Sequence, residues 1–260
     1  MPLLKDTIWL ECTSQTASAG YMGSFTGNRK ALLIDETGGY LVNTPAYKVA
    51  DNLKVRIVKA VADEDGNLLA EINNVYSGLQ QEFPHALMLD ASSEQREKYL
   101  NQLFYLPTYQ VLKNNYKEHK GIIPTVDEYL QIQLDNYAAI SGKRFFINPN
   151  IFGGATEKLL ADTARQYDYI IKDAYRDIDS VEIKIPRGYN PEMLQKDILL
   201  QTKFGKYISS VKIVDNKIIY YRMMEQYSGR FAAKDYNDLA KFYDQVFKAD
   251  RNKLVLVKVE

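Results

Sequence analysis

Three side chains are the first candidates for chemistry, because a thiol and an imidazole together can form a nucleophile and its base. The sequence holds one cysteine, Cys12, and two histidines, His85 and His119. A catalytic cysteine usually lies at a helix N-terminus beside a histidine, and these neighbours lower the pKa of the thiol. Cys12 instead follows a predicted strand, and both histidines belong to distant segments. We therefore predict that Cys12 is a buried or half-buried structural thiol and that both histidines are structural residues.

Metal and cofactor sites are not indicated by the residue spacing. Neither histidine has a partner at the spacing of metal ligands, and the sequence contains no HExxH or CxxC motif. Glycine-rich phosphate loops are missing as well, since the glycine pairs at 38–39 and 153–154 are typical of turns. We predict that the chain holds no metal ion and no cofactor.

The charge balance and the apolar runs limit the classes of partner. Lysine plus arginine and aspartate plus glutamate both number 33, and a formal net charge of zero argues against a nucleic-acid partner. No apolar run approaches the roughly 18 residues needed to span a bilayer, so no membrane span is predicted. Charged residues at Lys5, Asp6 and Glu11 also interrupt the apolar core that a signal peptide would need.

Alternation of apolar and polar residues predicts that most of the chain is strand. The segments with this pattern lie at 7–10, 30–34, 40–42, 53–57, 68–72, 109–116, 128–137, 144–147, 165–175, 181–185, 207–214, 217–224 and 254–259. Turn signals at 63–67 and 215–216 make two pairs of these strands into hairpins. Helices are predicted only at 92–104 and 235–248. The pattern predicts a mainly β chain with a β-sandwich-like domain and two helices.

The segment Trp9-Leu10-Glu11-Cys12-Thr13 resembles the last motif of transglutaminase-like cysteine enzymes, which has the form Trp-x-Asp-x-Thr. In that family the acidic residue of the motif orients the catalytic histidine. The resemblance extends through 20–25 and 29–34 and reappears at 179–189 and 203–207. It is to a subgroup of multidomain bacterial transglutaminase-like proteins with a C-terminal β-rich domain of unknown function. The resemblance implies that Glu11 occupies the position of the triad acid.

Two departures from the family pattern bear on activity. The catalytic cysteine and histidine of the family precede the motif, and only eight residues precede Trp9 here. The acid is also Glu11 rather than aspartate, and its extra methylene displaces the carboxylate by on the order of 1 Å, which can be costly in catalysis. The triad is therefore incomplete, and we predict that this chain alone is not an enzyme.

The first hypothesis is a structural or protein-binding role. Residues 1–46 would be the end of a transglutaminase-like core, and residues 47–260 would be a β-sandwich-like C-terminal domain. The partner would be the protein's own upstream core or another protein, contacted by aromatic residues such as those at 167–175. The resemblance implies export to the periplasm of a Gram-negative bacterium, and the oligomeric state is left open.

Two alternatives remain. The chain could be part of an active thiol acyltransferase or peptidase whose cysteine and histidine lie upstream, with Glu11 as the third member of the triad. A carbohydrate-binding β-sandwich is the other alternative. It is disfavoured because sugar-binding surfaces usually use exposed tryptophan, and Trp9 lies in the core motif.

Overall fold

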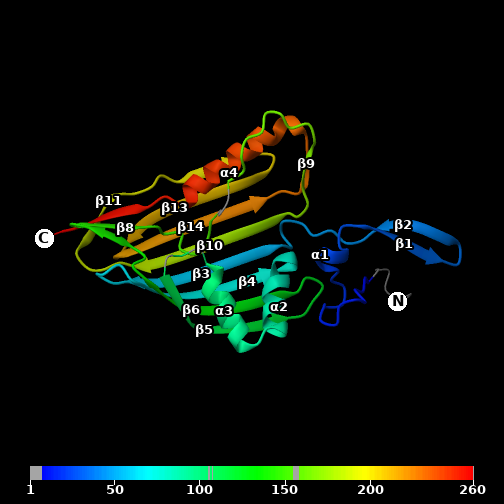
Figure 1. Ribbon diagram of the computed structural model, residues 1–260, viewed down its shortest axis with the longest axis horizontal. Coiled ribbons are helices and arrows are strands. Elements are labelled where there is room, and N and C mark those ends of the chain that lie inside the picture. The colour runs from blue at the N-terminus through cyan, green and yellow to red at the C-terminus, as the bar shows by residue number, and fades with distance from the viewer. Residues whose placement is uncertain (1–7, 105, 107, 155–157, 260) are drawn as a thin grey trace.

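Two packed sheets form most of the computed structural model, which describes residues 8–104, 106, 108–154 and 158–259. An eight-stranded sheet runs through the middle of the molecule (Figure 1). In order across this sheet, the strands are β12 (Ile198–Gln201), β13 (Gly205–Val214), β14 (Lys217–Gln226), β10 (Tyr175–Lys184), β3 (Leu53–Ala62), β4 (Leu68–Ser77), β6 (Thr125–Asp135) and β5 (Thr108–His119). Neighbouring strands are antiparallel except β3 and β10, which are parallel.

The second sheet has four short strands and packs on one end of the large sheet. Its strands are β11 (Tyr189–Met193), β16 (Leu254–Lys258), β8 (Arg144–Ile147) and β7 (Ala139–Ser141). Buried side chains such as Phe145 and Leu256 belong to the same core cluster as Ile72 and Leu130 of the large sheet. The prediction of a mainly β, sandwich-like fold is therefore confirmed.

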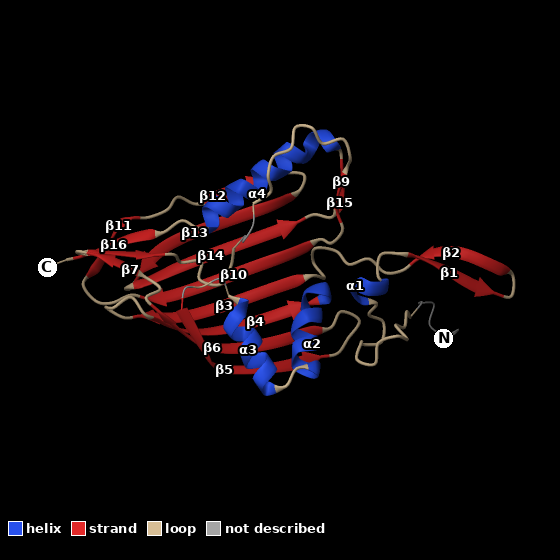
Figure 2. Ribbon diagram, in the orientation of Figure 1, coloured by secondary structure: helices blue, strands red, loops and turns tan. Residues whose placement is uncertain are grey.

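The two faces of the large sheet differ in exposure. Along β4 the residues Leu68, Ala70 and Ile72 are buried, whereas the intervening Leu69 and Glu71 are exposed. Side chains alternate between the faces of a strand, so this pattern separates an inner face from an outer face. The inner face carries the four-stranded sheet at one end and the helices at the other (Figure 2).

Three helices of nine or more residues lie over the inner face: α2 (Glu82–Asp90), α3 (Ser93–Leu103) and α4 (Tyr236–Asp250) (Figure 2). The predicted helices at 92–104 and 235–248 correspond to α3 and α4. Ser92 begins α3 with a capping box, in which its hydroxyl accepts from the Gln95 amide while the Gln95 side chain accepts from the Ser92 amide.

The predicted number of helices is too small, because the prediction omits α2 and the single turn α1 (Gly23–Thr26). Pro84 lies inside α2, at its third residue. A proline is tolerated there because the first amides of a helix have no acceptor within the helix. The sequence signal for a helix at 82–90 was therefore obscured by a residue that normally ends one.

Two predicted strands are wrong in the part of the chain that is described. Residues 8–10 of the predicted strand at 7–10 are irregular, and the Trp9 carbonyl accepts a hydrogen bond from the Gly20 amide at 3.0 Å. No neighbouring strand pairs with this segment in the described residues, and residue 7 lies outside them. A strand needs such a neighbour to persist in water.

The predicted strand at 165–175 is reduced to β9 (Tyr169–Ile171), which pairs with β15 (Gly229–Phe231), and to the start of β10 at Tyr175. The guanidinium carbon of Arg165 lies 4.4 Å from the centre of the Tyr236 ring on α4. This packing holds the start of the segment against a helix instead of a neighbouring strand.

The strands predicted at 30–34 and 40–42 are confirmed as β1 (Lys30–Asp35) and β2 (Gly38–Asn43). They form a separate two-stranded sheet that extends away from the large sheet, beyond α1 (Figure 1). In the described part of the chain, no helix combines the length and the apolar character that crossing a bilayer would require.

Replacing Ile72 by alanine should lower the free energy of unfolding by about 2–5 kcal/mol, because the substitution leaves a cavity in a close-packed core. The matched control is Ile57→Ala on the outer face, where Ile57 is 48% exposed and Ile72 is fully buried. Urea denaturation measures both, and the control should lose less than about 1 kcal/mol. Equal losses would contradict the assignment of inner and outer faces.

Candidate functional site

Glu11, the predicted triad acid, is held by hydroxyl groups. Its carboxylate accepts a hydrogen bond from the Thr13 amide at 2.9 Å and further hydrogen bonds from the hydroxyls of Thr13 and Thr26. The Thr13 hydroxyl, followed by that of Thr26, lowers the pKa of Glu11 below its usual value. The carboxylate is therefore ionised and oriented at neutral pH. Its described partners do not include a histidine, so its role as a triad acid remains a prediction.

Cys12 is exposed, so the prediction of a buried or half-buried thiol is wrong. Since residues 8–11 do not form the predicted strand, no paired neighbour covers the thiol. Each histidine instead contacts a carboxylate. The distance from His85 Nε2 to Glu118 Oε1 is 3.1 Å, and that from His119 Nε2 to Asp127 Oδ2 is 2.8 Å. No cluster of His, Cys, Asp and Glu side chains able to hold a metal ion occurs in the described ranges.

The aromatic segment at 167–175 does not present one surface. Tyr167 is exposed, whereas the ring of Tyr169 packs edge-on against Tyr236 of α4. Ile171 is buried, and Tyr175 lines a cavity on the inner face of the large sheet. The proposed contact surface at 167–175 is therefore divided among four environments, and its role in binding stays a prediction.

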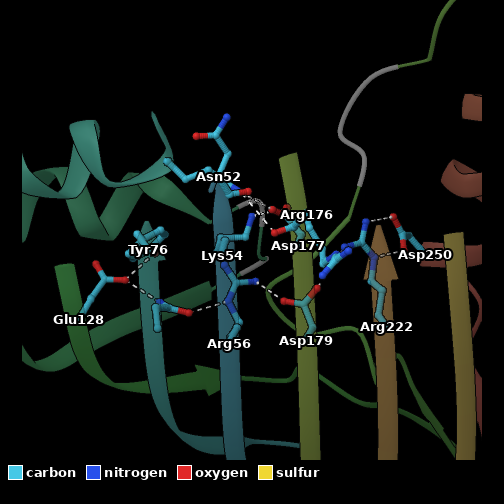
Figure 3. A network of polar contacts seen from close by, with 12 residues as sticks. Asn52, Lys54, Arg56, Tyr76, Glu128, Arg176, Asp177, Asp179, Arg222 and Asp250 are labelled. Carbon is cyan, nitrogen blue, oxygen red and sulfur yellow. Dashed lines mark hydrogen bonds and ion pairs between the residues drawn. The ribbon is translucent and has the colours of Figure 1, made fainter. Parts of the chain in front are cut away.

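A row of buried polar side chains crosses the inner face of the large sheet (Figure 3). Glu128, Asn74, Arg56, Asp179 and Arg222 lie on β6, β4, β3, β10 and β14, and each is directly opposite the next in the strand register. We refer to these five residues as the polar row. Buried charges are costly unless they are paired, so the contacts along the row decide whether it is stable.

At one end of the polar row, Glu128 accepts three hydrogen bonds. Asn74 and the hydroxyl of Tyr76 donate to one carboxylate oxygen at 2.6 and 2.8 Å, and the hydroxyl of Tyr116 donates to the other at 2.7 Å. Burial, followed by the charge of Glu128, raises the pKa of both tyrosines. The phenols therefore stay protonated and act as donors.

At the other end, Arg222 joins the sheet to α4. Its guanidinium donates to both oxygens of Asp250, at 2.7 and 3.1 Å, and to Asp179 at 3.0 Å. Asp250 also accepts from the Tyr207 hydroxyl at 2.9 Å. Burial opposes the charge on Arg222, but Asp250 and then Asp179 outweigh it and raise the pKa of the guanidinium. Because Asp250 is the last residue of α4, this ion pair fixes the end of the helix to the sheet.

Two adjoining cavities are lined in part by residues of the polar row. The larger encloses about 270 Å³ and has Lys54, Arg56 and aromatic side chains in its lining. The smaller, of about 160 Å³, is lined in part by Asp177 and Arg222, and Lys54 and Phe152 line both cavities. Lys54 and Asp177 pair at 2.5 Å. The charged and aromatic side chains of both linings can hold a polar or aromatic group by ion pairs, hydrogen bonds and ring contacts.

The polar row is absent from the sequence-based predictions, although the alternation of residues marks two of its members as inward-facing. Arg56 has the same strand parity as the buried Val58 and Ala60, and Asp179 has the same parity as the buried Val181 and Ile183. A charged residue in phase with buried apolar residues indicates an internal ion pair. Only the folded sheet, however, identifies which charges meet.

The fold is thus that of a mainly β, sandwich-like protein, and within the described ranges the contacts of both histidines are with carboxylates. Residues 143–256 match the family described as "Domain of Unknown Function with solved-structure structure (DUF3858)". No curated protein matches the chain.

One similar solved structure is that of a protein from Parabacteroides distasonis, described as a "putative protease". The identity is 15%, the TM-score is 0.34, and the match covers 38% of this chain and 19% of that protein. The matched part is therefore about a fifth of the length of that protein. A likeness this distant carries no conclusion about activity.

Replacing Arg222 by methionine should lower the free energy of unfolding by about 3–5 kcal/mol, because Asp179 and Asp250 would keep buried charges without their partner. The control is Arg230→Met, which breaks the ion pair with Asp168 at 2.9 Å on the surface. An exposed pair contributes only about 0–1 kcal/mol. Urea denaturation of both variants is the measurement, and similar losses would contradict the structural role of the polar row.

Proposed function

We propose that this chain is a non-catalytic β-sandwich-like module that packs on a transglutaminase-like core through the hairpin formed by β1 and β2. The observation that carries the proposal is a set of exposed apolar side chains on this hairpin. We refer to the set as the hairpin surface, and its members are Leu32, Leu33, Ile34, Tyr40 and Leu41.

The hairpin surface includes both faces of the two-stranded sheet. Leu32 is opposite Leu41 on one face, and Leu33 is opposite Tyr40 on the other. A two-stranded sheet alone is at best marginally stable in water, and contiguous exposed apolar surface marks interaction sites. Apolar pairs on both faces therefore favour insertion of the hairpin into a larger structure.

The nature of the partner follows from the segment that contains the hairpin. Glu11 occupies the acid position of the transglutaminase-like motif, and Thr26, just before the hairpin, donates to its carboxylate. The motif and the hairpin are thus linked in one N-terminal region, which we assign to residues 1–46. Residues 47–260 then form the C-terminal module. The core would come from a longer polypeptide or from a separate chain.

The hairpin proposal is tested by the variant Leu33→Asp/Leu41→Asp, which places charge on both faces of the hairpin. Its binding to a separately produced transglutaminase-like core from the same organism is measured by titration calorimetry. We expect a loss of more than about 2 kcal/mol, or at least about thirtyfold in the dissociation constant, because buried apolar anchors dominate interfaces.

The matched control is Ile57→Asp/Val61→Asp, since both residues are exposed on the outer face of the large sheet. This control should bind like the unmodified chain. A core that does not bind the unmodified chain, or an equal loss in the control, would contradict docking through the hairpin.

A second candidate function is participation in a thiol acyltransferase or peptidase. It is favoured by the ionised, hydroxyl-oriented carboxylate of Glu11, because such a carboxylate can hold an imidazole in position and stabilise its protonated form. The core would provide the cysteine and the histidine.

Glu11→Gln distinguishes the two functions. If the assembly is an amide-cleaving or amide-transferring enzyme, this variant should lower turnover by about 10²-fold or more with binding of the core unchanged, because the orienting charge is lost. An assembly that has no such activity, or whose rate is unchanged in the variant, would remove the second candidate and leave the first.

A further inference from the structure

A cavity of about 240 Å³ lies between the N-terminal segment and α2, and we refer to it as the N-terminal cavity. Four carboxylates line it: Glu11, Glu82, Asp90 and Glu118. Its described lining contains no lysine or arginine and one histidine, His85, which contacts Glu118. Carboxylates therefore outnumber basic groups in the lining.

The carboxylate of Glu82 already accepts three hydrogen bonds from the N-terminal segment. The Tyr21 hydroxyl and the Ser24 amide donate to one of its oxygens at 2.8 and 2.7 Å, and the Ser24 hydroxyl donates to the other at 2.6 Å. Burial, followed by the charge of Glu82, raises the pKa of Tyr21, so its phenol remains a donor. Glu82 therefore anchors the N-terminal segment to α2 and is not the group that needs a further partner.

The other carboxylates have unused acceptor capacity. Glu118 contacts His85 at 3.1 Å, and Asp90 has no hydrogen bond or ion pair with the described residues. The carboxylate of Glu11 is satisfied by neutral donors only, the hydroxyls and one amide. Each ionised carboxylate can accept about four hydrogen bonds. The cavity thus carries more acceptors than its own donors occupy.

Two buried polar atoms of the lining also have no hydrogen-bond partner in the described residues. Gln81 lines the cavity and is 4% exposed, and its side-chain oxygen accepts no hydrogen bond within the described ranges. The hydroxyl of Ser18, also in the lining, has no partner there either. A buried acceptor without a donor costs about 1–3 kcal/mol. Both atoms are covered by their neighbours, so a ligand with several N–H donors would recover this cost once the Gln81 and Ser18 side chains turn toward the cavity.

The apolar part of the lining suits an aliphatic chain. Met22, Phe25 and Leu89 line the cavity together with the acids. Lysine and arginine bury their methylene groups along such surfaces and keep the charged head beside polar groups. The volume is below the roughly 300–1,000 Å³ of pockets that take drug-sized ligands, so a single side chain fits the space better than a longer segment.

We propose that the N-terminal cavity receives one cationic side chain, a lysine or an arginine, from the partner that covers the hairpin surface. The identification of the partner rests on the proposed function, whereas the cation site itself does not. Both features belong to the same N-terminal region, so one partner can fill the cavity and cover the hairpin.

The site is tested first on the chain alone with single-residue probes. These are N-acetyl-lysine methylamide and N-acetyl-arginine methylamide, with N-acetyl-norleucine methylamide as the uncharged control of similar shape. Binding is followed by changes in the NMR signals of the backbone amides of Gly23, Ser24 and Gln81. We expect dissociation constants on the order of millimolar for the cationic probes, as is reasonable for ligands of this size, and at least about tenfold weaker binding of norleucine.

The variant Asp90→Asn/Glu118→Gln removes two charges and keeps the size of both side chains. It should weaken the cationic probes by at least about tenfold, since attraction to the exposed Asp90 and the largely buried Glu118 accounts for most of the recognition. The matched control is Glu71→Gln/Glu97→Gln, which changes the net charge equally at two exposed positions elsewhere. Equal binding of norleucine and lysine, or no effect of Asp90→Asn/Glu118→Gln, would overturn the cation site.

Titration of the transglutaminase-like core separates this inference from the proposed function. A core that binds the unmodified chain but binds Asp90→Asn/Glu118→Gln equally well would support docking and overturn the role of the cavity in it. Cationic probes that bind the chain when the core does not would support the cation site and overturn the proposed function.

Discussion

The pairing of Arg222 with Asp179 and Asp250 is the constraint on which the inner face of the large sheet depends. A guanidinium at 5% side-chain exposure is tolerable only if its donors and charge are matched, and here two carboxylates from different elements match them. One carboxylate belongs to β10 and the other to the end of α4. The same contacts that neutralise the charge therefore set where the helix lies, and the polar row continues this matching as far as Glu128.

The regular elements that could be predicted from the sequence are those with local signals. The hairpins follow from alternating residues around turn signals, and α3 follows from the capping box at Ser92. The polar row could not be predicted in this way. Arg56 and Asp179 are far apart in sequence and become neighbours only through the parallel pairing of β3 and β10. The alternation marks each residue as inward-facing, but nothing within either strand indicates which residue it will contact.

The structure of the N-terminal region also depends on contacts that the local sequence does not indicate. The resemblance to the transglutaminase-like motif drew attention to Glu11, whose role as a triad acid stays a prediction; its carboxylate is held by the hydroxyls of Thr13 and Thr26. The strand expected around it is not formed, because strand formation depends on a neighbour that local sequence does not supply. Two groups of the N-terminal cavity lie at the ends of α2, a helix absent from the sequence-based predictions: Gln81 is its N-cap and Asp90 its last residue. The acidic cavity could therefore be recognised only from the folded chain.

The parallel contact between β3 and β10 has a consequence for where this protein can be divided. The sequence match to the domain family covers residues 143–256, which include β10, β12, β13 and β14 but none of β3 to β6. A fragment with only those residues would leave β10 as a bare edge, with unpaired amides and carbonyls along its length, and would leave Asp179 without Arg56. Such edges are sites of aggregation. The residues that match the domain family are thus fewer than the residues needed to complete the large sheet.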